Sequence, residues 1–429
     1  MNQFLFNRDK SETLVYFGLI IFYLIFFFNL IINSGSNWSL LKLFIVLLPV
    51  ALYKNKVFSF DKWILITILP AFVFFYLNEI ILHNNLVKLD LFDNRFYEKR
   101  ITQFLFILAF TLMPTLICKA KFNNKVFFKI IMLATALSVF YNGYWNLKLS
   151  FDRGLLAAKY DMVILYDYSI IAITLVALCY CIQLKNKYSY VFMSICLINI
   201  TLIILHGSRG AWLGVPVGLL IIFMIYYKIE KQKVLFGFLA SSLITLGLIY
   251  IPNSPVMSRI SEFKQDTSLM ENKDYNSSLG NRIALFNFSI DKFKESPIVG
   301  VGVKQLAQDI CDLSKQKVIP ECSPHMHNVY LQELLSRGLL GFLALILMFF
   351  TPLICFLTAL LRKPNANIRL ICTSGITFTI YFMICGLTDY VFFMMFTTML
   401  YFLCVCTLMS FIYQVKKFTL LSEPTINKS

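Results

Sequence analysis

The stretch from Ser323 to Gly341 contains the residue types that most directly suggest chemistry, and it joins the longest polar segment to an apolar helix. Pro324 interrupts regular structure there, so His327 and Asn328 are expected where that helix begins. The unpaired N–H groups and partial positive charge of a helix start disfavour imidazolium. His327 is therefore predicted to be neutral and able to accept a proton. The alternative is a pair that only caps a helix at a membrane surface.

Arg209 is a candidate for binding phosphate. It lies in the sequence HGSRGAWLG, where Gly207 and Gly210 permit a tight turn that brings backbone N–H groups close to a ligand. Its planar, permanently charged guanidinium suits phosphate oxygens. Gly214 and Gly218 continue the four-residue spacing, which predicts close helix packing for these two glycines.

Arg282 is a second candidate for the same ligand. Apolar residues recur at helical spacing from there to Pro297, which predicts an amphipathic helix on the membrane or against a helical bundle. Taken alone, Arg282 is better explained as a solvated or lipid-facing charge. Its interest depends on its lying close to Arg209 and His327.

These residue types favour a transfer reaction from a donor that is already activated. The sequence has no phosphate-binding loop, nucleotide fold or acidic pair with metal-ligand spacing, so we predict neither a metal nor a cofactor. The outer face of a membrane has no access to ATP, and a lipid-linked diphosphate is the natural donor there. Two arginines would neutralise the leaving diphosphate while a neutral histidine deprotonates the attacking hydroxyl.

The elements that position these residues are predicted to be membrane helices. The chain has 429 residues, of which 58% are hydrophobic and 14% charged, and this composition excludes a soluble protein of that length. Apolar runs near the length that crosses roughly 30 Å of hydrocarbon number about twelve. They are Leu14–Ile32, Trp38–Tyr53, Trp63–Leu82, Ile101–Cys118, Val126–Trp145, Val163–Ile182, Tyr188–Leu205, Ala211–Tyr227, Val234–Ile251, Leu339–Leu361, Leu370–Leu387 and Tyr390–Tyr413. Leu14–Ile32 is too long for the apolar part of a signal peptide.

The distribution of charge sets the orientation. With a cytoplasmic N-terminus, the inner segments contain twenty lysines and arginines against five acids, nearly the whole net charge of +16. The positive charge is thus explained by topology, and no nucleic-acid partner is predicted. The charged residues in or beside the spans all lie toward the outer face (Lys42, Glu79, Asp167, Arg209 and Asp389).

Three regions follow from this topology. Residues 1–251 are predicted to form about nine spans, and residues 337–429 about three spans and a cytoplasmic tail. Residues 252–336 form an outer, partly helical loop of about 85 residues, a length usually associated with function. Cys311 and Cys322 lie in this loop and form either a disulfide or two free thiols.

The combination of Ser208-Arg209-Gly210 at an outer turn, a long loop containing Arg282-Ile283-Ala284-Leu285-Phe286, and His325-Met326-His327-Asn328 followed by Leu331-Gln332, Gly338 and Gly341 resembles the O-antigen ligase family. That superfamily includes O-antigen polymerases and O-oligosaccharyltransferases. The resemblance covers nearly the whole chain. The chain departs from many relatives at Ser336-Arg337-Gly338, where they have a glutamate shortly before the glycine.

The resemblance implies a metal-independent glycosyltransferase of the bacterial inner membrane that acts at the periplasmic face. It would transfer O-antigen from undecaprenyl diphosphate to a sugar hydroxyl of lipid A–core. By matching position, His327 would be the general base, and Arg209 and Arg282 would bind the donor diphosphate. The further residues implied at the substrate site are Arg153, His325, Asn328 and Asp389.

Two alternatives stay open at this point. An O-antigen polymerase uses the same donor and chemistry with a glycan chain as acceptor. A lipid-linked glycan transporter is the alternative from another class. It predicts polar residues through the membrane midplane and repeated halves, whereas the charges here lie toward one face.

Overall fold

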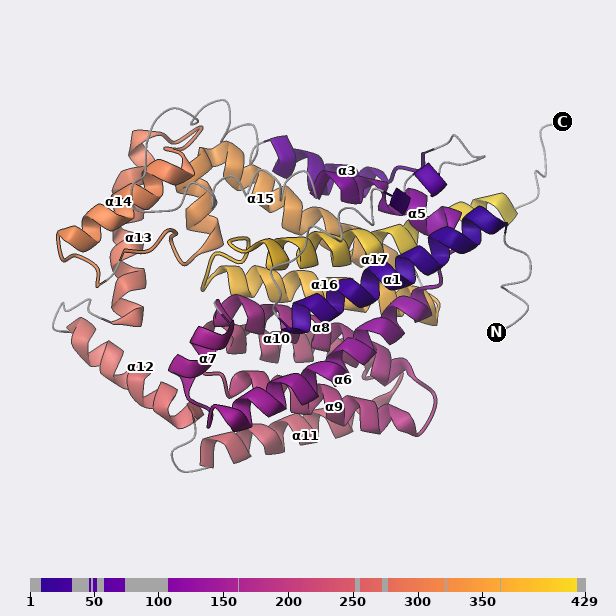
Figure 1. Ribbon diagram of the computed structural model, residues 1–429, viewed down its shortest axis with the longest axis horizontal. Coiled ribbons are helices and arrows are strands. Elements are labelled where there is room, and N and C mark those ends of the chain that lie inside the picture. Colours follow the sequence, from indigo (N-terminus) through magenta and orange to yellow (C-terminus); the bar gives the residue numbers. More distant parts are fainter. Residues whose placement is uncertain are drawn as a thin grey trace.

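The structure is a computed structural model that describes residues 9–32, 46–47, 49–51, 58–73, 107–160, 162–250, 255–271, 277–320, 322–362 and 364–422. All regular elements of these residues are helices, and no strand occurs among them. This confirms the predicted all-α class. The long helices run side by side along one direction, with their connections at the two ends of a bundle (Figure 1).

Seven described helices are long and apolar enough to cross a membrane, which indicates a multi-pass membrane protein. They are α1 (Lys10–Ile32), α6 (Asn124–Lys148), α8 (Val163–Gln183), α10 (Arg209–Tyr226), α15 (Val329–Leu361), α16 (Ala366–Gly386) and α17 (Met395–Ser422). Other predicted spans contain α3 (Lys62–Ala71), η3 (Phe110–Leu112), α5 (Met113–Lys119), α9 (Tyr188–Ile204) and α11 (Lys231–Tyr250). Most of Trp38–Tyr53, as well as Lys42 and Glu79, falls outside the described residues. The total of about twelve spans therefore stays a prediction.

The centre of the bundle is α8, which packs against α6, α9, α10 and α16. It is apolar nearly all round, as expected for a helix surrounded by others. The glycines of α10 allow α8 and α16 to pack closely against α10. A Cβ atom at Gly214 would lie 2.5 Å from Tyr381 Cδ2, and one at Gly218 would lie 2.8 Å from Leu175 Cδ1. The predicted packing role of these two glycines is confirmed.

Four shorter helices gather at one end of the bundle: α7 (Arg153–Tyr160), α12 (Pro255–Glu271), α13 (Ser278–Glu295) and α14 (Val303–Lys315) (Figure 1). The last three belong to the long loop, which has a small apolar core of its own that includes Leu285, Leu306, Ile310, Met326 and Leu335. An ion pair of 2.8 Å between Lys292 Nζ and Asp309 Oδ2 also joins α13 to α14. The loop is thus a folded cap on the end of the bundle.

A backbone break at Gly338 separates the beginning of α15 from its membrane-spanning part. Gly338 has φ 66° and ψ −164°, a conformation that L side chains rarely adopt. A Cβ atom there would lie 2.2 Å from Ile298 O, and the Leu339 N–H donates to Pro297 O at 2.8 Å. The break divides α15 directly before Leu339, where the sequence predicts that the span begins. Residues 329–337 thus form a short helix that packs with the cap.

Two predicted boundaries shift. The amphipathic helix begins at Ser278 rather than Arg282, because the Ser277 side chain accepts the Gly280 N–H and caps it. The last helix begins at Met395, whereas Tyr390 was predicted. The Tyr390 N–H donates to Asp389 Oδ1 at 2.7 Å, so the backbone is held in a turn after α16.

Candidate functional site

Asn328 is the residue that begins α15. Its side-chain oxygen accepts the N–H groups of Tyr330 and Leu331 at 2.9 and 3.0 Å, and its amide nitrogen donates to Leu387 O at 3.1 Å. The capping interpretation is therefore correct for Asn328. His327 lies just before the cap with φ 49°, outside the helix, and this turn directs its ring away from α15 toward the turn after α16.

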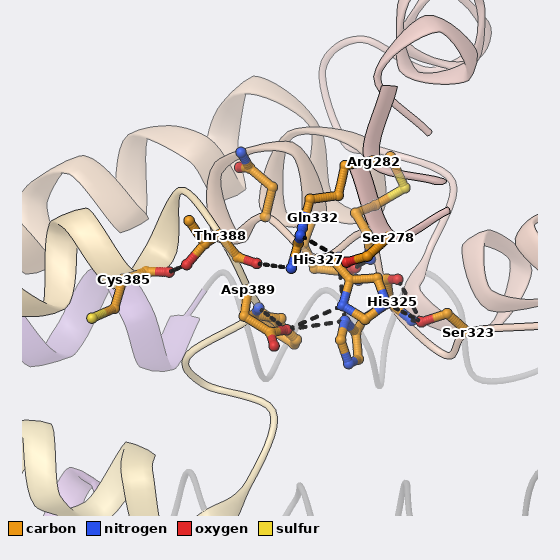
Figure 2. A network of polar contacts seen from close by, with 12 residues as sticks. Ser278, Arg282, Ser323, His325, His327, Gln332, Cys385, Thr388 and Asp389 are labelled. Atoms are coloured by element: carbon orange, nitrogen blue, oxygen red, sulfur yellow. Dashed lines mark hydrogen bonds and ion pairs between the residues drawn. The ribbon is translucent and has the colours of Figure 1, made fainter. Parts of the chain in front are cut away.

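Asp389 is the residue that the two histidines share. Its Oδ1 lies 3.4 Å from His327 Nδ1 and 3.6 Å from His325 Nδ1 (Figure 2). Burial alone would raise the pKa of this carboxyl. The hydrogen bond from His327 and the charges of both histidines outweigh burial, and the pKa is below its usual value. We call His325, His327 and Asp389 the histidine group. The prediction of a neutral His327 considered only the helix start and took no account of the Asp389 carboxylate.

The second ring nitrogen of His327 faces Ser323. His327 Nε2 lies 3.1 Å from Ser323 Oγ, which itself donates to His325 O at 2.9 Å. The preceding residue, Cys322, forms a disulfide with Cys311 of α14, which resolves the alternative left open by the sequence. The His327 side chain is 27% exposed and that of His325 only 2%. Of the two histidines, His327 is the one a substrate can reach.

Arg282 reaches the same turn from the cap. Its Nη2 donates to Thr388 O at 3.3 Å, next to Asp389, and its Nη1 donates to Ser278 Oγ at 3.2 Å (Figure 2). Its Nε is buried without a hydrogen-bond partner in the described part of the chain. Arg282 therefore has a donor left for a ligand beside the histidine group.

The start of α10 packs on the other side of this turn. Thr388 Oγ1 lies 2.9 Å from Tyr168 Oη, and a Cβ atom at Gly210 would lie 2.5 Å from each of these oxygens. Only glycine fits there. Arg209 begins α10 next to it, so the structure brings the chain around Arg209, Arg282 and the histidine group together at Thr388 and Asp389.

Arg209 itself belongs to a cluster of three arginines. Its Nη2 donates to Asp266 Oδ2 of α12 at 3.3 Å, and Arg259 of the same helix pairs with Glu262. A Cβ atom at Gly207, where φ is 76°, would lie 3.0 Å from Arg259 Nε and 3.5 Å from Arg153 Cδ.

These charges perturb one another. Burial lowers the pKa of Arg153, and the positive charges of Arg259 and Arg209 lower it further, whereas Glu262 opposes this. Guanidinium groups this close favour an anion between them. We call Arg153, Arg209 and Arg259 the arginine group.

Sequence reasoning did not identify four residues that form ion pairs in this region: Arg259, His206, Glu333 and Arg337. Arg259 had no distinguishing neighbours in the sequence. His206 Nδ1 lies 2.6 Å from Asp167 Oδ1, and both side chains are fully buried. Glu333 pairs with Arg337 and accepts the Tyr390 hydroxyl at 2.8 Å. Only the Glu333 and Arg337 pair left a signal, since opposite charges four residues apart in an apolar helix predict a pair.

The histidine group also has donor atoms that a divalent cation can use. Two imidazole nitrogens and a carboxylate oxygen lie within 4.8 Å of one another. Each of these side chains already has a hydrogen-bond partner: Ser323 for His327, the His327 N–H for His325, and the Tyr390 N–H for Asp389. Metal independence stays a prediction.

Comparison with known proteins supports the family resemblance. Residues 192–346 match the family described as O-Antigen ligase; this range includes Arg209, Arg282, His325, His327 and Asn328. A Haemophilus influenzae protein described as uncharacterized is 33% identical over 179 residues, 40% of this chain. The chain spans 44% of that relative's length. Residues 192–346 of this chain are thus similar to the O-antigen ligase family.

Proposed function

We propose that this protein is an O-antigen ligase. It transfers O-antigen from undecaprenyl diphosphate to a sugar hydroxyl of lipid A–core at the periplasmic face of the inner membrane. The observation that carries the proposal is the turn at Thr388 and Asp389. Asp389 contacts His327 at 3.4 Å on one side, and Thr388 accepts a hydrogen bond from Arg282 on the other. The proposed base and the proposed phosphate-binding group thus lie on either side of one turn.

Asp389 orients the base. A carboxylate on Nδ1 fixes the hydrogen on that nitrogen and leaves Nε2 as the acceptor. The acceptor sugar hydroxyl takes the place of Ser323 at Nε2 and gives its proton to His327. Its oxygen forms a bond to the anomeric carbon of the donor, while the bond from that carbon to the diphosphate oxygen breaks. The bonding electrons leave with the diphosphate.

The arginines stabilise the charge that develops on the diphosphate. Arg282 supplies the unpaired Nε beside the histidine group, and the arginine group supplies further guanidinium groups at the start of α10. Charge-assisted hydrogen bonds from guanidinium to phosphate are about twice as strong as neutral ones. We propose that the acidic partners of these arginines, Asp266 and Glu262, are displaced when the donor binds.

The test is a two-substrate assay with purified protein, a lipid-linked polysaccharide donor and lipid A–core as acceptor, with EDTA present. Transfer to lipid A–core supports the ligase. Transfer only to a second glycan chain would support the polymerase. If no sugar is transferred but the lipid-linked donor moves across the bilayer, the result would support a transporter. In cells, gene deletion is expected to leave core without O-antigen while lipid-linked polymer accumulates. Core bearing a single repeat unit would contradict the ligase.

A further inference from the structure

A cleft of about 840 Å³ lies among helix ends. It is lined by the first turns of α1, the start of α6, the start of α16 and the last turns of α17. Figure 1 shows these helix ends at the end of the bundle opposite the cap. The distribution of lysines predicts that this end faces the cytoplasm. The cleft takes no part in the proposed transfer.

Three lysines stand at the mouth of the cleft: Lys121, Lys125 and Lys129. All three are exposed, and Lys121 pairs with Glu12 at 3.2 Å. No ion pair joins Lys125 or Lys129 to an acid among the described residues, and the first turn of α6 contains no acid. An adjoining cavity of about 330 Å³ shares Lys121 and adds Lys119 and Lys417. The mouth therefore has a local excess of positive charge.

The walls of the cleft are apolar and aromatic. Phe122, Ile371 and Phe411 are buried in its lining, while Phe17 and Phe418 are 50% and 42% exposed along it. A small anion would be bound by the lysines alone and would leave this apolar surface uncovered. A ligand with an anionic head and hydrocarbon chains fits both parts. Basic pockets between membrane helices on the cytoplasmic side bind the headgroups of anionic lipids.

We propose that this cleft binds an anionic phospholipid of the inner leaflet. Its phosphate contacts Lys121, Lys125 and Lys129, and its acyl chains lie along Phe17 and Phe418. The recognised chemistry is a phosphate diester with no compensating positive charge, joined to hydrocarbon. Such a lipid would fix the ends of α1, α6 and α17 relative to one another.

The test is native mass spectrometry of the purified, delipidated full chain titrated with phosphatidylglycerol or phosphatidylcholine. The variant is K121Q/K125Q/K129Q, and the matched control is K185Q/K187Q/K228Q, which removes three exposed lysines of the same predicted face outside the cleft. We expect one phosphatidylglycerol bound preferentially. At about a fivefold loss per lysine, affinity should fall on the order of a hundredfold in the cleft variant and stay unchanged in the control.

Two further arms make the result decisive. The variant K121R/K125R/K129R keeps the charge and should keep the lipid, which separates loss of charge from loss of fold. Inorganic phosphate is titrated as a competitor, and it should not displace the lipid at equal concentration. Equal losses in the cleft and control variants, no preference over phosphatidylcholine, or displacement by inorganic phosphate would each overturn the proposal.

Discussion

The histidine group and the arginine group lie at the same end of the bundle but differ in how their charges are satisfied. In the histidine group, one buried carboxylate contacts two imidazoles, and one ring nitrogen faces a hydroxyl. In the arginine group, Arg153 and Arg259 lie beside Gly207, and acids on α12 pair with Arg209 and Arg259. The histidine group fixes a single proton-accepting atom, whereas the arginine group contains positive charges that an anionic ligand can bind. We therefore expect changes in the first to reduce turnover and changes in the second to weaken donor binding.

The largest effect is expected from His327→Ala. It removes the proposed base, so kcat should fall about a hundredfold to ten-thousandfold. The side chain is 27% exposed, so the melting temperature should change little. Transfer and thermal unfolding are measured on the same detergent-purified sample. Transfer by the His327→Ala protein at the wild-type rate would show that His327 is not the base. The proposed difference between the histidine group and the arginine group would then fail as well.

Asp389→Asn is expected to rank second, because the amide keeps the shape but loses the charge that orients His327. We expect kcat to fall about a hundredfold with little change in the donor KM. The lowered pKa of Asp389 stabilises the fold above the usual pKa of an aspartate, and this contribution is lost as pH falls below about 4. Thermal unfolding between pH 6 and pH 3 should therefore show a smaller acid loss in the variant. An identical acid loss would contradict the assigned pKa shift.

Arg209→Lys tests the other half of the comparison. Lysine keeps the charge but not the planar fork, so the donor KM should rise about tenfold to a hundredfold with a smaller change in kcat. Arg362→Lys, an exposed arginine after α15, is the matched control and should leave both constants unchanged. A fall in kcat with no change in donor KM would place Arg209 with the histidine group instead.

The smallest effect is expected from the disulfide between Cys311 and Cys322. It holds the segment just before Ser323 and His327, so its loss in Cys311→Ser/Cys322→Ser should lower kcat about threefold to tenfold through poorer positioning. Donor KM should stay constant, because the disulfide joins α14 to the segment before His327 and bonds no residue of the arginine group. A reductant should lower wild-type turnover by a similar factor and leave the double variant unaffected. Equal sensitivity of both proteins to reductant would contradict this role.

Much of the fold was predictable because apolar length is a local property. Composition predicts that the tenth span begins at Leu339, and the structure has a backbone break at the preceding residue, Gly338, which has a positive φ. The predicted helix start at Tyr390 was wrong. Hydropathy does not register that the Asp389 side chain holds the Tyr390 N–H in a turn.

The candidate site divides in the same way. His327, Arg209 and Arg282 carry signals in their own neighbourhoods: a proline before a helix, two glycines, and an amphipathic period. Arg259 and His206 do not, because their importance comes from neighbours that are distant in sequence: Gly207 and Arg153 for the first, Asp167 for the second. Which helices lie side by side decides such pairs, and the sequence of one helix does not contain that information.

The central claim is that Asp389 acts through His327, and a double-mutant cycle tests it most directly. Single-turnover transfer is measured for wild type, His327→Ala, Asp389→Asn and the double variant. If the two residues act as a unit, Asp389→Asn should lower the residual rate of the His327→Ala protein by less than about twofold. If the two losses multiply, the carboxylate acts independently of the imidazole, and the account is wrong.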